Sequence, residues 1–565
     1  MSETLTPEAA TAPAGVAPAG EALSVAPARP RIAARSRALP AAVAAQLVPL
    51  ALALAGVVLF ALLDPHPVDL AAGTYRADLF AREGFTVWNA QWYGGHHTAP
   101  YSVLFPPLAA LVGPAVLGAM AALASAALFE ALTRRWAGGA ARVGAAWFGL
   151  GTGTLLFTGR MPFALGVAIG LGALLALQRG RVPLAVALAA ACSLASPVAG
   201  LFVALAAAAH AIAAHRAASA AVAGAALAPP LALAVVFPSS GEQYFSWTEL
   251  YWLLFTAAAL YALAGPHERT LRAGAALYAL AGIAAFVTPT PLGNNITRLG
   301  PLVAGPLIAC VLVRCDGPRG LKRPLALACL SLLAFSLFWP AWEDYRKVSG
   351  DPAAQRSYYQ PLTAFLATQG GPPGRVEIPF TRAHWETATV AERFPLARGW
   401  ERQLELRRNP LFYGGAPLDA RTYRRWLADN GVRWVAVPDA ALDFSAYAER
   451  RLIDSGLPYL TLRARLPHWR VYEHTGRHSL VVPEGPARMR VRNLTAQGVS
   501  LAVDRPGAAV VRVRWTPYWQ APGACVESTP AGWTRVTAER AGMLRMSARF
   551  SLERVVRRGR RCTAG

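Results

Sequence analysis

The sequence has little charge and almost no lysine. Charged residues make up 15% of its 565 residues, whereas hydrophobic residues make up 54%. Lys322 and Lys347 are the only lysines, so arginine supplies nearly all of the positive charge behind the net charge of +23. The arginines are scattered among aromatic and acidic residues instead of forming a basic module, which argues against a nucleic-acid partner. Attraction to anionic membrane lipid or phosphate is favoured instead.

Cofactor and metal motifs are also missing. The chain has no Walker loop and no GxGxxG loop with suitable flanks, so we expect no ATP-driven or nicotinamide-driven mechanism. It has no CxxC or HExxH spacing either, and we predict no metal and no cofactor. A divalent metal held by His96 and His97 with Asp64 and His66 stays open as an alternative, although adjacent histidines point in different directions.

Long apolar runs are the main feature that is present, and they are typical of polytopic membrane proteins. Residues 1–40 are rich in alanine and proline without periodicity, which predicts a disordered cytoplasmic tail. The run at 41–63 is too long for a signal-peptide core, so we interpret it as an uncleaved membrane helix. We predict a membrane domain at 41–342 with about eleven spans, at 41–63, 108–133, 142–159, 161–178, 182–195, 197–214, 218–237, 248–265, 272–289, 297–313 and 324–342.

The arginines in the connections indicate the topology. If Ser196-Pro197 is a turn, all six arginine-bearing connections lie on one side of the membrane, as the positive-inside rule requires. If 182–215 is one long helix instead, the last two connections move to the other side. Because a proline disfavours helix at the residue before it, we adopt the turn. The prediction is a multi-pass protein of a bacterial plasma membrane, with a cytoplasmic N-terminus and an extracytoplasmic C-terminal part.

The residues after 342 have the patterns of water-soluble domains. Helix and strand signals alternate at 343–477, which predicts an extracytoplasmic α/β domain. Polar and apolar residues alternate at 478–565 between turn residues, which predicts an extracytoplasmic β-sandwich. Cys525 and Cys562 are the only cysteines of this outer part, and we predict a disulfide between them, with two free buried thiols as the alternative.

The polar loop at 64–107 holds the main catalytic candidate. Asp69, Arg76 and Glu83 are spaced by seven residues, so they share one face if this segment is helical. Asp69 lies six residues beyond the first apolar run, close to the outer membrane surface. Partial desolvation there raises the pKa of a carboxylate and suits it to act as a general base. We therefore predict that Asp69 is catalytic.

Aromatic and basic residues of the same loop are candidates for substrate binding. Aromatic rings suit the apolar faces of sugars, but they also populate the headgroup belt of membrane proteins. Both interpretations stay open for each tryptophan. The predicted substrate-binding residues are Arg76, Trp88, Trp92, Tyr93 and His96.

Two arginines on the predicted outer side are exceptions to the positive-inside rule. Arg160 and Arg298 each lie at the end of a span, and a charge placed there against the trend is a functional candidate. The alternative is an interfacial arginine whose head reaches the headgroups. Arg298 follows Asn294 and Asn295, so donor groups converge at this point. We therefore regard these four residues as functional candidates.

Several segments resemble GT-C type membrane glycosyltransferases. The run from Asp69 through YRADLFAREGFTVWNAQWYGG to YSVLFPP resembles the first extracytoplasmic loop of that family. TGRMPFALG, LASPVAGLF, TPLGNNITRLGPLVAGPL, LARGWERQLE and NPLFYGG are similar in kind, and the resemblance covers most of 41–475. It is strongest to a bacterial branch related to YfhO-like proteins and to membrane proteins related to 6-pyruvoyl-tetrahydropterin synthase.

The resemblance implies transfer of a sugar from a polyprenyl-phosphate donor to a glycan or lipid acceptor of the cell envelope. Asp69 matches the position of the family's catalytic carboxylate. Arg298, with Asn294 and Asn295, and then Arg160 would bind the donor phosphate. Many members have an adjacent acidic pair, whereas the carboxylates here are separated, which leaves a catalytically silent relative open. The alanine-rich and arginine-rich composition suggests a GC-rich genome, such as that of an actinobacterium.

Two other functions compete with this prediction. A transporter or flippase of envelope precursors would show two similar halves and charged or broken helices near the middle of the bilayer. The chain has no convincing internal repeat, and its spans are nearly free of buried charge. The third function is that of a non-catalytic envelope assembly protein whose β-sandwich binds glycan.

Overall fold

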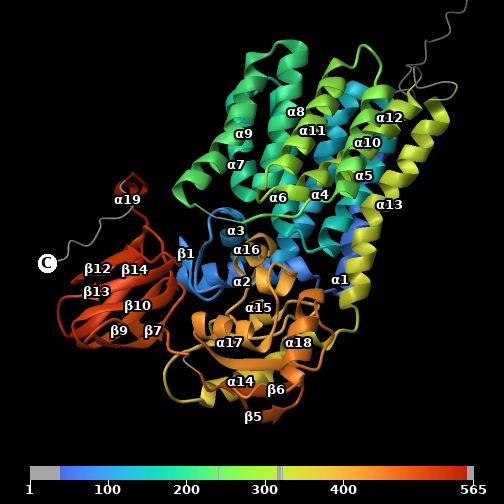
Figure 1. Ribbon diagram of the computed structural model, residues 1–565. Helices are drawn as coiled ribbons and strands as arrows, with labels where there is room; N and C mark the ends of the chain where they lie inside the picture. The colour runs from blue at the N-terminus through green and yellow to red at the C-terminus, as the bar shows by residue number, and fades with distance from the viewer. Residues whose placement is uncertain (1–37, 239–240, 315–319, 321, 477, 557–565) are drawn as a thin grey trace, which may run out of the picture. The chain divides into compact units, whose positions relative to one another are not determined.

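Apolar helices form the first half of the computed structural model, which describes residues 38–238, 241–314, 320, 322–476 and 478–556 (Figure 1). Pro49 lies inside the first helix, and Pro229 and Pro230 lie inside the ninth. The helices are α1 (Ala38–Leu63), α2 (Val68–Glu83), α3 (Phe105–Val112), α4 (Pro114–Ala137), α5 (Ala141–Phe157), α6 (Met161–Gln178), α7 (Val182–Ala195), α8 (Pro197–Ala214), α9 (Ala217–Val236), α10 (Trp247–Leu263), α11 (Arg269–Val287), α12 (Gly305–Val313) and α13 (Lys322–Val348), with the short helices η1 (Gly138–Ala140), η2 (Gly293–Arg298) and η3 (Gly300–Ala304). Residues 1–37 of the predicted tail lie outside the described residues.

Each predicted span coincides with a helical segment, but not every segment is long enough to cross a bilayer alone. Seven helical segments of the described residues pass that test by length and composition, or up to eight if the bent pair α1 and α2 is one span. One of the seven, Pro114–Phe157, holds both α4 and α5, which pack against each other. Helix α7 has 14 residues, fewer than the roughly 20 that a hydrocarbon core requires. The fold is that of a multi-pass membrane protein.

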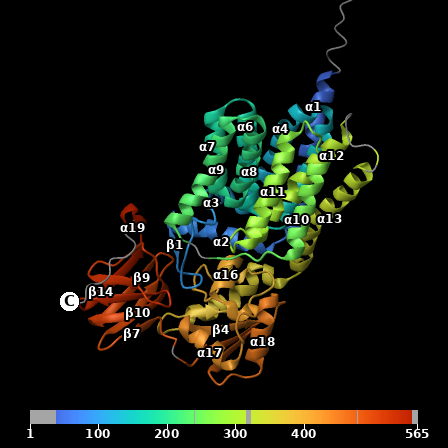
Figure 2. The ribbon, with the colours of Figure 1, turned by 45° about the horizontal axis from the view of Figure 1, so that its top comes forward.

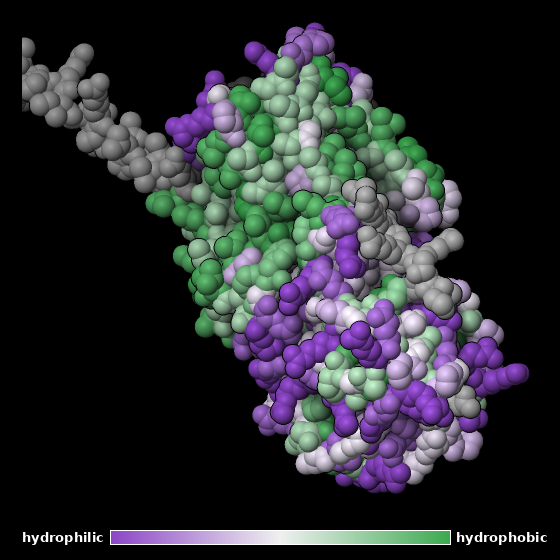
Figure 3. Space-filling view, turned by 90° about the vertical axis from the view of Figure 1, so that its left-hand side faces the viewer, coloured by the Kyte–Doolittle hydropathy of each residue, from purple (hydrophilic) through white to green (hydrophobic). Residues whose placement is uncertain are grey.

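The distribution of apolar surface separates the helices from the rest of the chain. Large hydrophobic side chains are exposed along most of the helices before residue 343, for example Leu62, Leu111 and Leu231. Few large hydrophobic side chains are exposed after residue 343. Figure 3 shows this division as a green surface over the helical part and a largely purple one over the remainder. Exposed apolar side chains on helices fit a lipid environment better than water.

Small residues let the helices approach closely. A Cβ atom on Gly149 would lie 2.3 Å from the carbonyl oxygen of Pro49, so α5 packs directly on the backbone of α1. A Cβ atom on Gly144 would lie 2.4 Å from the carbonyl oxygen of Pro306 in α12. Close backbone contact of this kind is typical of membrane helices, where burial in lipid gives no hydrophobic driving force for association.

The segments that were predicted on the outer side lie together at one end of the bundle. The backbone N–H of Val103 donates to the carbonyl of Leu194, next to the Ser196 turn. The N–H of Gln243 donates to the carbonyl of Thr290. The turn at Ser196-Pro197 is confirmed, because α7 ends at Ala195 and α8 begins at Pro197. Which side of the membrane this end faces stays a prediction.

Residues 343–476 contain a four-stranded mixed sheet with short helices around it. Its strand order is β3-β4-β6-β5, in which β3 and β4 are parallel and the other pairs antiparallel. The elements are η4 (Pro352–Ala354), η5 (Arg356–Tyr359), α14 (Gln360–Thr368), β3 (Arg375–Glu377), α15 (Glu386–Thr389), α16 (Arg402–Arg408), η6 (Pro410–Tyr413), α17 (Ala420–Asp429), β4 (Val432–Pro438), η7 (Phe444–Ala446), α18 (Tyr447–Asp454), β5 (Leu460–Leu466) and β6 (Trp469–His474). We refer to this part as the α/β region.

The C-terminal strands form two antiparallel four-stranded sheets, which we call the sandwich. One sheet has the order β12-β13-β10-β7 and the other β11-β14-β9-β8. Alternate residues such as Val511, Leu501 and Met546 are buried in a shared apolar core. The elements are β7 (Val481–Pro483), β8 (Arg488–Leu494), β9 (Gly498–Arg505), β10 (Gly507–Arg514), β11 (Trp519–Gln520), β12 (Ala524–Ser528), β13 (Trp533–Ala538), β14 (Gly542–Ala548) and α19 (Leu552–Val556).

Candidate functional site

Helix α2 turns the chain away from the bundle and carries Asp69 in its first turn. The angle between α1 and α2 is 84°, so α2 runs across the direction of α1. Pro67 precedes α2 and fixes the backbone at its start. A carboxylate in the first turn is stabilised by the partial positive charge of the helix N-terminus. In both ribbon views α2 lies at the end of the bundle next to α16 (Figures 1 and 2).

Asp69 faces Arg160 from the turn between α5 and α6. Oδ2 of Asp69 lies 3.9 Å from Nε of Arg160, and 43% of the Asp69 side chain is exposed. The Nε atom of Arg160 is buried and has no hydrogen-bond partner among the described residues. This carboxylate is therefore held near a cation and remains open to a ligand.

Gly159 fixes the distance between these two residues. It has a φ of +70°, and a Cβ atom there would lie 2.5 Å from the backbone nitrogen of Leu70 and 3.1 Å from the carbonyl carbon of Asp69. The turn thus lies directly against the first turn of α2. Only glycine combines this backbone conformation with so close an approach.

We expect Gly159→Ala to destabilise the protein more than Gly180→Ala. Both glycines have φ near +70°, so alanine costs about 1–2 kcal/mol of backbone strain at each. A Cβ atom on Gly180 meets nothing within 4 Å, whereas one on Gly159 collides with the backbone of α2. Overpacking typically adds about 1–3 kcal/mol. Thermal unfolding of both purified variants measures the difference, and equal melting temperatures would contradict the close contact.

Arg298 adds a second guanidinium to this cluster. Its guanidinium lies 5.5 Å from the centre of the Phe163 ring. No hydrogen-bond acceptor contacts the Arg298 side chain among the described residues, and the charges of Arg160 and Asp69 act on it. The structure therefore brings Asp69, Arg160 and Arg298 together from three separate segments of the chain. We call these three residues the Asp69 cluster.

Two further residues beside the cluster were missed by the sequence analysis. Asp344 lies near the end of α13, and its electrostatic neighbours include Arg160 and Asp69. Tyr101 lies in the loop before α3, within electrostatic range of Asp69 and Arg298. The sequence signal that could have identified Asp344 is its place directly after the last apolar run. No such signal could have identified Tyr101, because its position beside the cluster depends on how the loop folds.

The two asparagines that were predicted with Arg298 are used within the protein. The side-chain amide of Asn294 donates to Oε1 of Glu249 at 2.6 Å and accepts from Gln243 at 3.1 Å. Glu249 is part of the capping box at the start of α10. The side-chain amide of Asn295 is buried and donates to the carbonyl of Pro291 at 3.5 Å. They hold η2 in place, which leaves the two arginines as the candidates for binding an anion.

Arg76 joins the loop to the α/β region. Its guanidinium donates to Oε2 of Glu401 at 2.7 Å, and its side chain is 3% exposed. It also lies 3.7 Å from the centre of the Tyr101 ring. A buried arginine that is already paired in this way positions Tyr101 at the edge of the Asp69 cluster, and it is not free to bind a substrate.

The aromatic residues that were predicted to bind substrate are buried where the loop meets the α/β region and the sandwich. Trp92 donates from Nε1 to the carbonyl of Thr387 at 3.0 Å, and Tyr93 donates to the carbonyl of Gly399 at 2.5 Å. His96 stacks on Trp92. Trp88 is 2% exposed and packs on residues of the sandwich core. Because these side chains are enclosed by protein, we leave them out of the proposed site.

The histidines considered as metal ligands are also separated. His97 bonds to Thr516 in the sandwich at 3.1 Å, and His66 packs edge-on against Trp385. Within the described ranges, no group of three histidine, cysteine, aspartate or glutamate residues is placed to hold a metal ion. Cys525 in β12 is in a disulfide, and Cys562, the predicted partner, lies outside the described residues.

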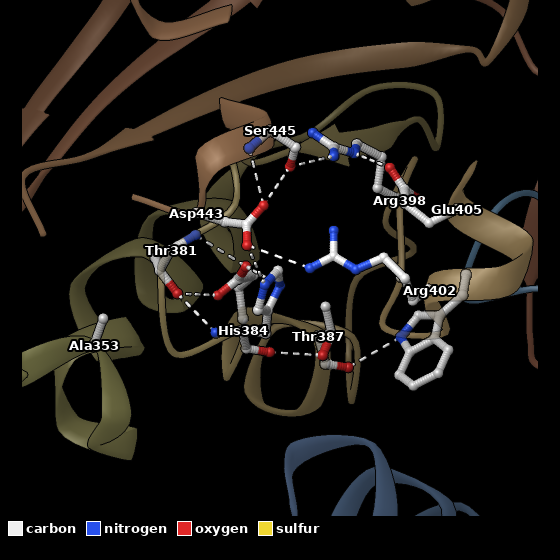
Figure 4. A network of polar contacts seen from close by, with 12 residues as sticks. Ala353, Thr381, His384, Thr387, Arg398, Arg402, Glu405, Asp443 and Ser445 are labelled. Carbon is white, nitrogen blue, oxygen red and sulfur yellow. Dashed lines mark hydrogen bonds and ion pairs between the residues drawn. The ribbon is translucent and has the colours of Figure 1, made fainter. Parts of the chain in front are cut away.

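A second polar network lies inside the α/β region, and none of its residues was a predicted site residue (Figure 4). Arg398 lies between two phenylalanine rings, 3.8 Å from the centre of Phe380 and 4.1 Å from that of Phe412. Its Nε donates to Glu405 at 2.6 Å. Glu449 lies 3.3 Å away and Glu377 3.6 Å away. One guanidinium thus lies beside three fully buried carboxyl groups. Burial raises the pKa of each of these groups, because it disfavours the charged form.

The other half of this network is built around His384 and Asp443. Nε2 of His384 lies 3.3 Å from Oδ2 of Asp443, which also pairs with Arg402 at 3.3 Å. Burial lowers the pKa of His384 to about 4 and raises that of Glu386 to about 7. Figure 4 shows the side chains of His384, Arg402 and Asp443 pointing towards one another. We therefore regard the network as structural.

Comparisons with known proteins give likenesses only among solved structures. No family model and no curated protein matches the chain. A cryo-EM structure of the mycobacterial arabinofuranosyltransferase AftD has a TM-score of 0.41 at 13% identity, covering 90% of this chain and 60% of its own. A second AftD structure has a TM-score of 0.39 at 16% identity, covering 79% and 42%. Apo ArnT from Cupriavidus metallidurans has a TM-score of 0.38 at 14% identity, covering 77% and 98%.

The chain therefore spans about three fifths of one AftD structure and a smaller share of the other. The resemblance to the YfhO-like branch stays a prediction. The functional conclusion is carried by the residues of the Asp69 cluster.

Proposed function

We propose that this chain is a GT-C type membrane glycosyltransferase, which moves a sugar from a polyprenyl-phosphate donor to an acceptor of the cell envelope. The observation that carries the proposal is the Asp69 cluster. It combines an accessible carboxylate with two arginines that are not neutralised by hydrogen-bonded acids. At this end of the bundle the polar α/β region also contacts helix α2, through the pair of Arg76 and Glu401.

In the proposed reaction Asp69 acts as the general base. It accepts the proton of the acceptor hydroxyl while that oxygen attacks the anomeric carbon of the donor sugar. The new bond joins the acceptor oxygen to the anomeric carbon, and the bond from that carbon to the phosphate oxygen breaks. The bonding electrons leave with the lipid phosphate, and the configuration at the anomeric carbon inverts. Asp69 is suited to this step because its side chain is open on one side.

The leaving phosphate gains negative charge during this step and needs donors that are already in place. Arg298 is the first candidate, since it has no competing acceptor among the described residues. Arg160 is the second, since its Nε is buried without a hydrogen-bond partner. Arg160 also lies beside the proposed base, with its Nε 3.9 Å from Oδ2 of Asp69. Tyr101 and Asp344 lie beside the Asp69 cluster and are candidates for orienting the sugar.

The proposal is tested with the full chain in lipid vesicles that contain a labelled polyprenyl-phosphate sugar. Transfer of label to an added envelope glycan is expected for the wild type. Arg298→Ala is expected to lower the rate about 10²–10³-fold, the usual effect of removing one donor to a developing oxyanion. Arg216→Ala is the matched control, because Arg216 is exposed at the start of α9, at the other end of the bundle.

Two outcomes would contradict the proposal. One is that no polyprenyl-phosphate sugar of any kind tested gives transfer with the wild type. The other is that Arg298→Ala and Arg216→Ala transfer sugar equally fast. Arabinose and mannose donors are the first to test, because the composition suggests an actinobacterium.

A further inference from the structure

The outer face of one sandwich sheet is hollowed into an open cavity. The sheet is the one with the order β11-β14-β9-β8 (Figure 1). The cavity has a volume of about 350 Å³. This is the size range of small-molecule sites. It lies away from the Asp69 cluster, since all of its lining residues belong to the sandwich.

The strand register explains why polar side chains line the cavity and why it is hollow. Leu544, Met546 and Ala548 of β14 point into the apolar core, so the residues between them point outwards. Arg545 is opposite Ser500 on β9, which is in turn opposite Asn493 on β8. In the next row Ser547 is flanked by Gln520 and by Gly498. The two serines and the glycine leave an empty floor between longer side chains.

The charges around this floor have one sign. Arg545 and Arg549 both line the cavity and are exposed. Neither side chain has a hydrogen bond or ion pair with another described residue, in contrast to Arg490, which pairs with Asp504. None of the described residues that line the cavity is acidic. Residues 478–556 as a whole carry eleven arginines against five acidic residues.

We propose that this cavity binds an anionic glycan, which presents a phosphate or carboxylate group to Arg545 and Arg549. Arginine binds both groups through paired donors of fixed geometry. The amides of Asn493 and Gln520 and the hydroxyls of Ser500 and Ser547 supply donors and acceptors for sugar hydroxyls. Among the residues that the structure describes, no aromatic side chain lines the cavity, so these residues offer no stacking surface of the kind that suits neutral sugars or nucleic-acid bases. This binding is independent of the proposed sugar transfer.

The test uses the full chain in nanodiscs and measures the affinity for three probes. They are an oligogalacturonate, which carries carboxylates, a phosphorylated mannan oligosaccharide, and a neutral dextran of similar length. We expect binding of at least one anionic probe, no measurable binding of dextran, and an affinity that falls as salt is added. The two anionic probes show which group the site takes.

Three variants separate the cavity from general basicity. The double substitution Arg545→Ala with Arg549→Ala is expected to weaken binding at least tenfold. Ser547→Phe fills the floor and keeps both arginines, and we expect a similar loss. Arg540→Ala removes one exposed positive charge outside the cavity and is expected to change affinity less than twofold.

The inference is wrong if dextran binds as tightly as the anionic probes, or if none of the three binds. It is also wrong if the double variant binds like the wild type, or if a single-stranded oligonucleotide, measured as a fourth probe, binds more tightly than either anionic glycan. Sugar transfer by the double variant is expected to match the wild type, so that a failure here leaves the proposed transfer function untouched.

Discussion

Asp69→Asn is expected to lower the rate of sugar transfer about 10²–10⁴-fold, the usual contribution of a general base. Asparagine keeps the size of the side chain and cannot accept the proton of the acceptor hydroxyl. The loss is expected in kcat, with the donor affinity changed much less, because the arginines that hold the phosphate remain. Initial rates at varied donor concentration, with the vesicle assay described above, separate the two effects.

Asp64→Asn is the matched control for this variant. Asp64 lies at the end of α1, five residues before Asp69, and its side chain is exposed. Its positive φ of 41° suits asparagine, so the substitution adds no strain. We expect transfer at the wild-type rate. If Asp69→Asn keeps that rate and Asp344→Asn loses it, Asp344 is the base and the assignment of Asp69 is wrong.

The ion pair with Arg160 does not complicate this test. Both side chains are partly exposed and their closest charged atoms are 3.9 Å apart. Pairs of this kind contribute about 0–1 kcal/mol to stability. The melting temperature of Asp69→Asn is therefore expected to stay close to that of the wild type, so that a lost rate reports on chemistry and not on unfolding.

Arg398→Leu is expected to destabilise the α/β region by about 3–5 kcal/mol, which is the usual cost of removing one partner of a buried ion pair. Arg398 is 1% exposed, and Glu377, Glu405 and Glu449 around it are fully buried. Leucine still packs between Phe380 and Phe412, so the loss comes from the carboxyl groups and not from an empty space. Denaturant unfolding followed by tryptophan fluorescence measures the change.

Two comparisons isolate the electrostatic cause. Arg356→Leu breaks an exposed pair with Glu392 and is expected to cost at most about 1 kcal/mol. Adding Glu405→Gln and Glu449→Gln to Arg398→Leu removes two of the buried carboxyl groups and is expected to restore part of the stability. The explanation is wrong if Arg398→Leu unfolds like the wild type, or if the added glutamines destabilise it further.

The helices and strands could largely be predicted from the sequence, because their patterns are local. The apolar runs predicted the helices of the bundle, and the proline at 197 indicated the break between α7 and α8. The alternating helix and strand signals at 343–477 predicted the α/β region, in which β4 spans Val432–Pro438. The strand at Leu460–Leu466 carries no such signal, because its residues are mostly exposed and lack a clear alternation of burial.

The candidate site was predicted in part, because its residues come from distant segments. Asp69, Arg160 and Arg298 stood out singly as charges at the ends of spans, and the structure brings them together. The partner of Arg76 could not be predicted, since Glu401 is 325 residues further along the chain. The same holds for Trp92 and Tyr93, whose partners lie in the α/β region. From residue type alone, both side chains suited sugar binding as well as they suit these buried contacts.

The central claim is that Arg160 and Arg298 bind the phosphate of a polyprenyl lipid beside Asp69. A cryo-EM structure of the full chain in nanodiscs with polyprenyl phosphate tests it most directly. The predicted result is phosphate density within hydrogen-bond distance of the Arg298 guanidinium, with the lipid chain running from there along the helices. Phosphate bound only at the opposite end of the bundle, beside Arg135 and Arg179, would contradict the claim.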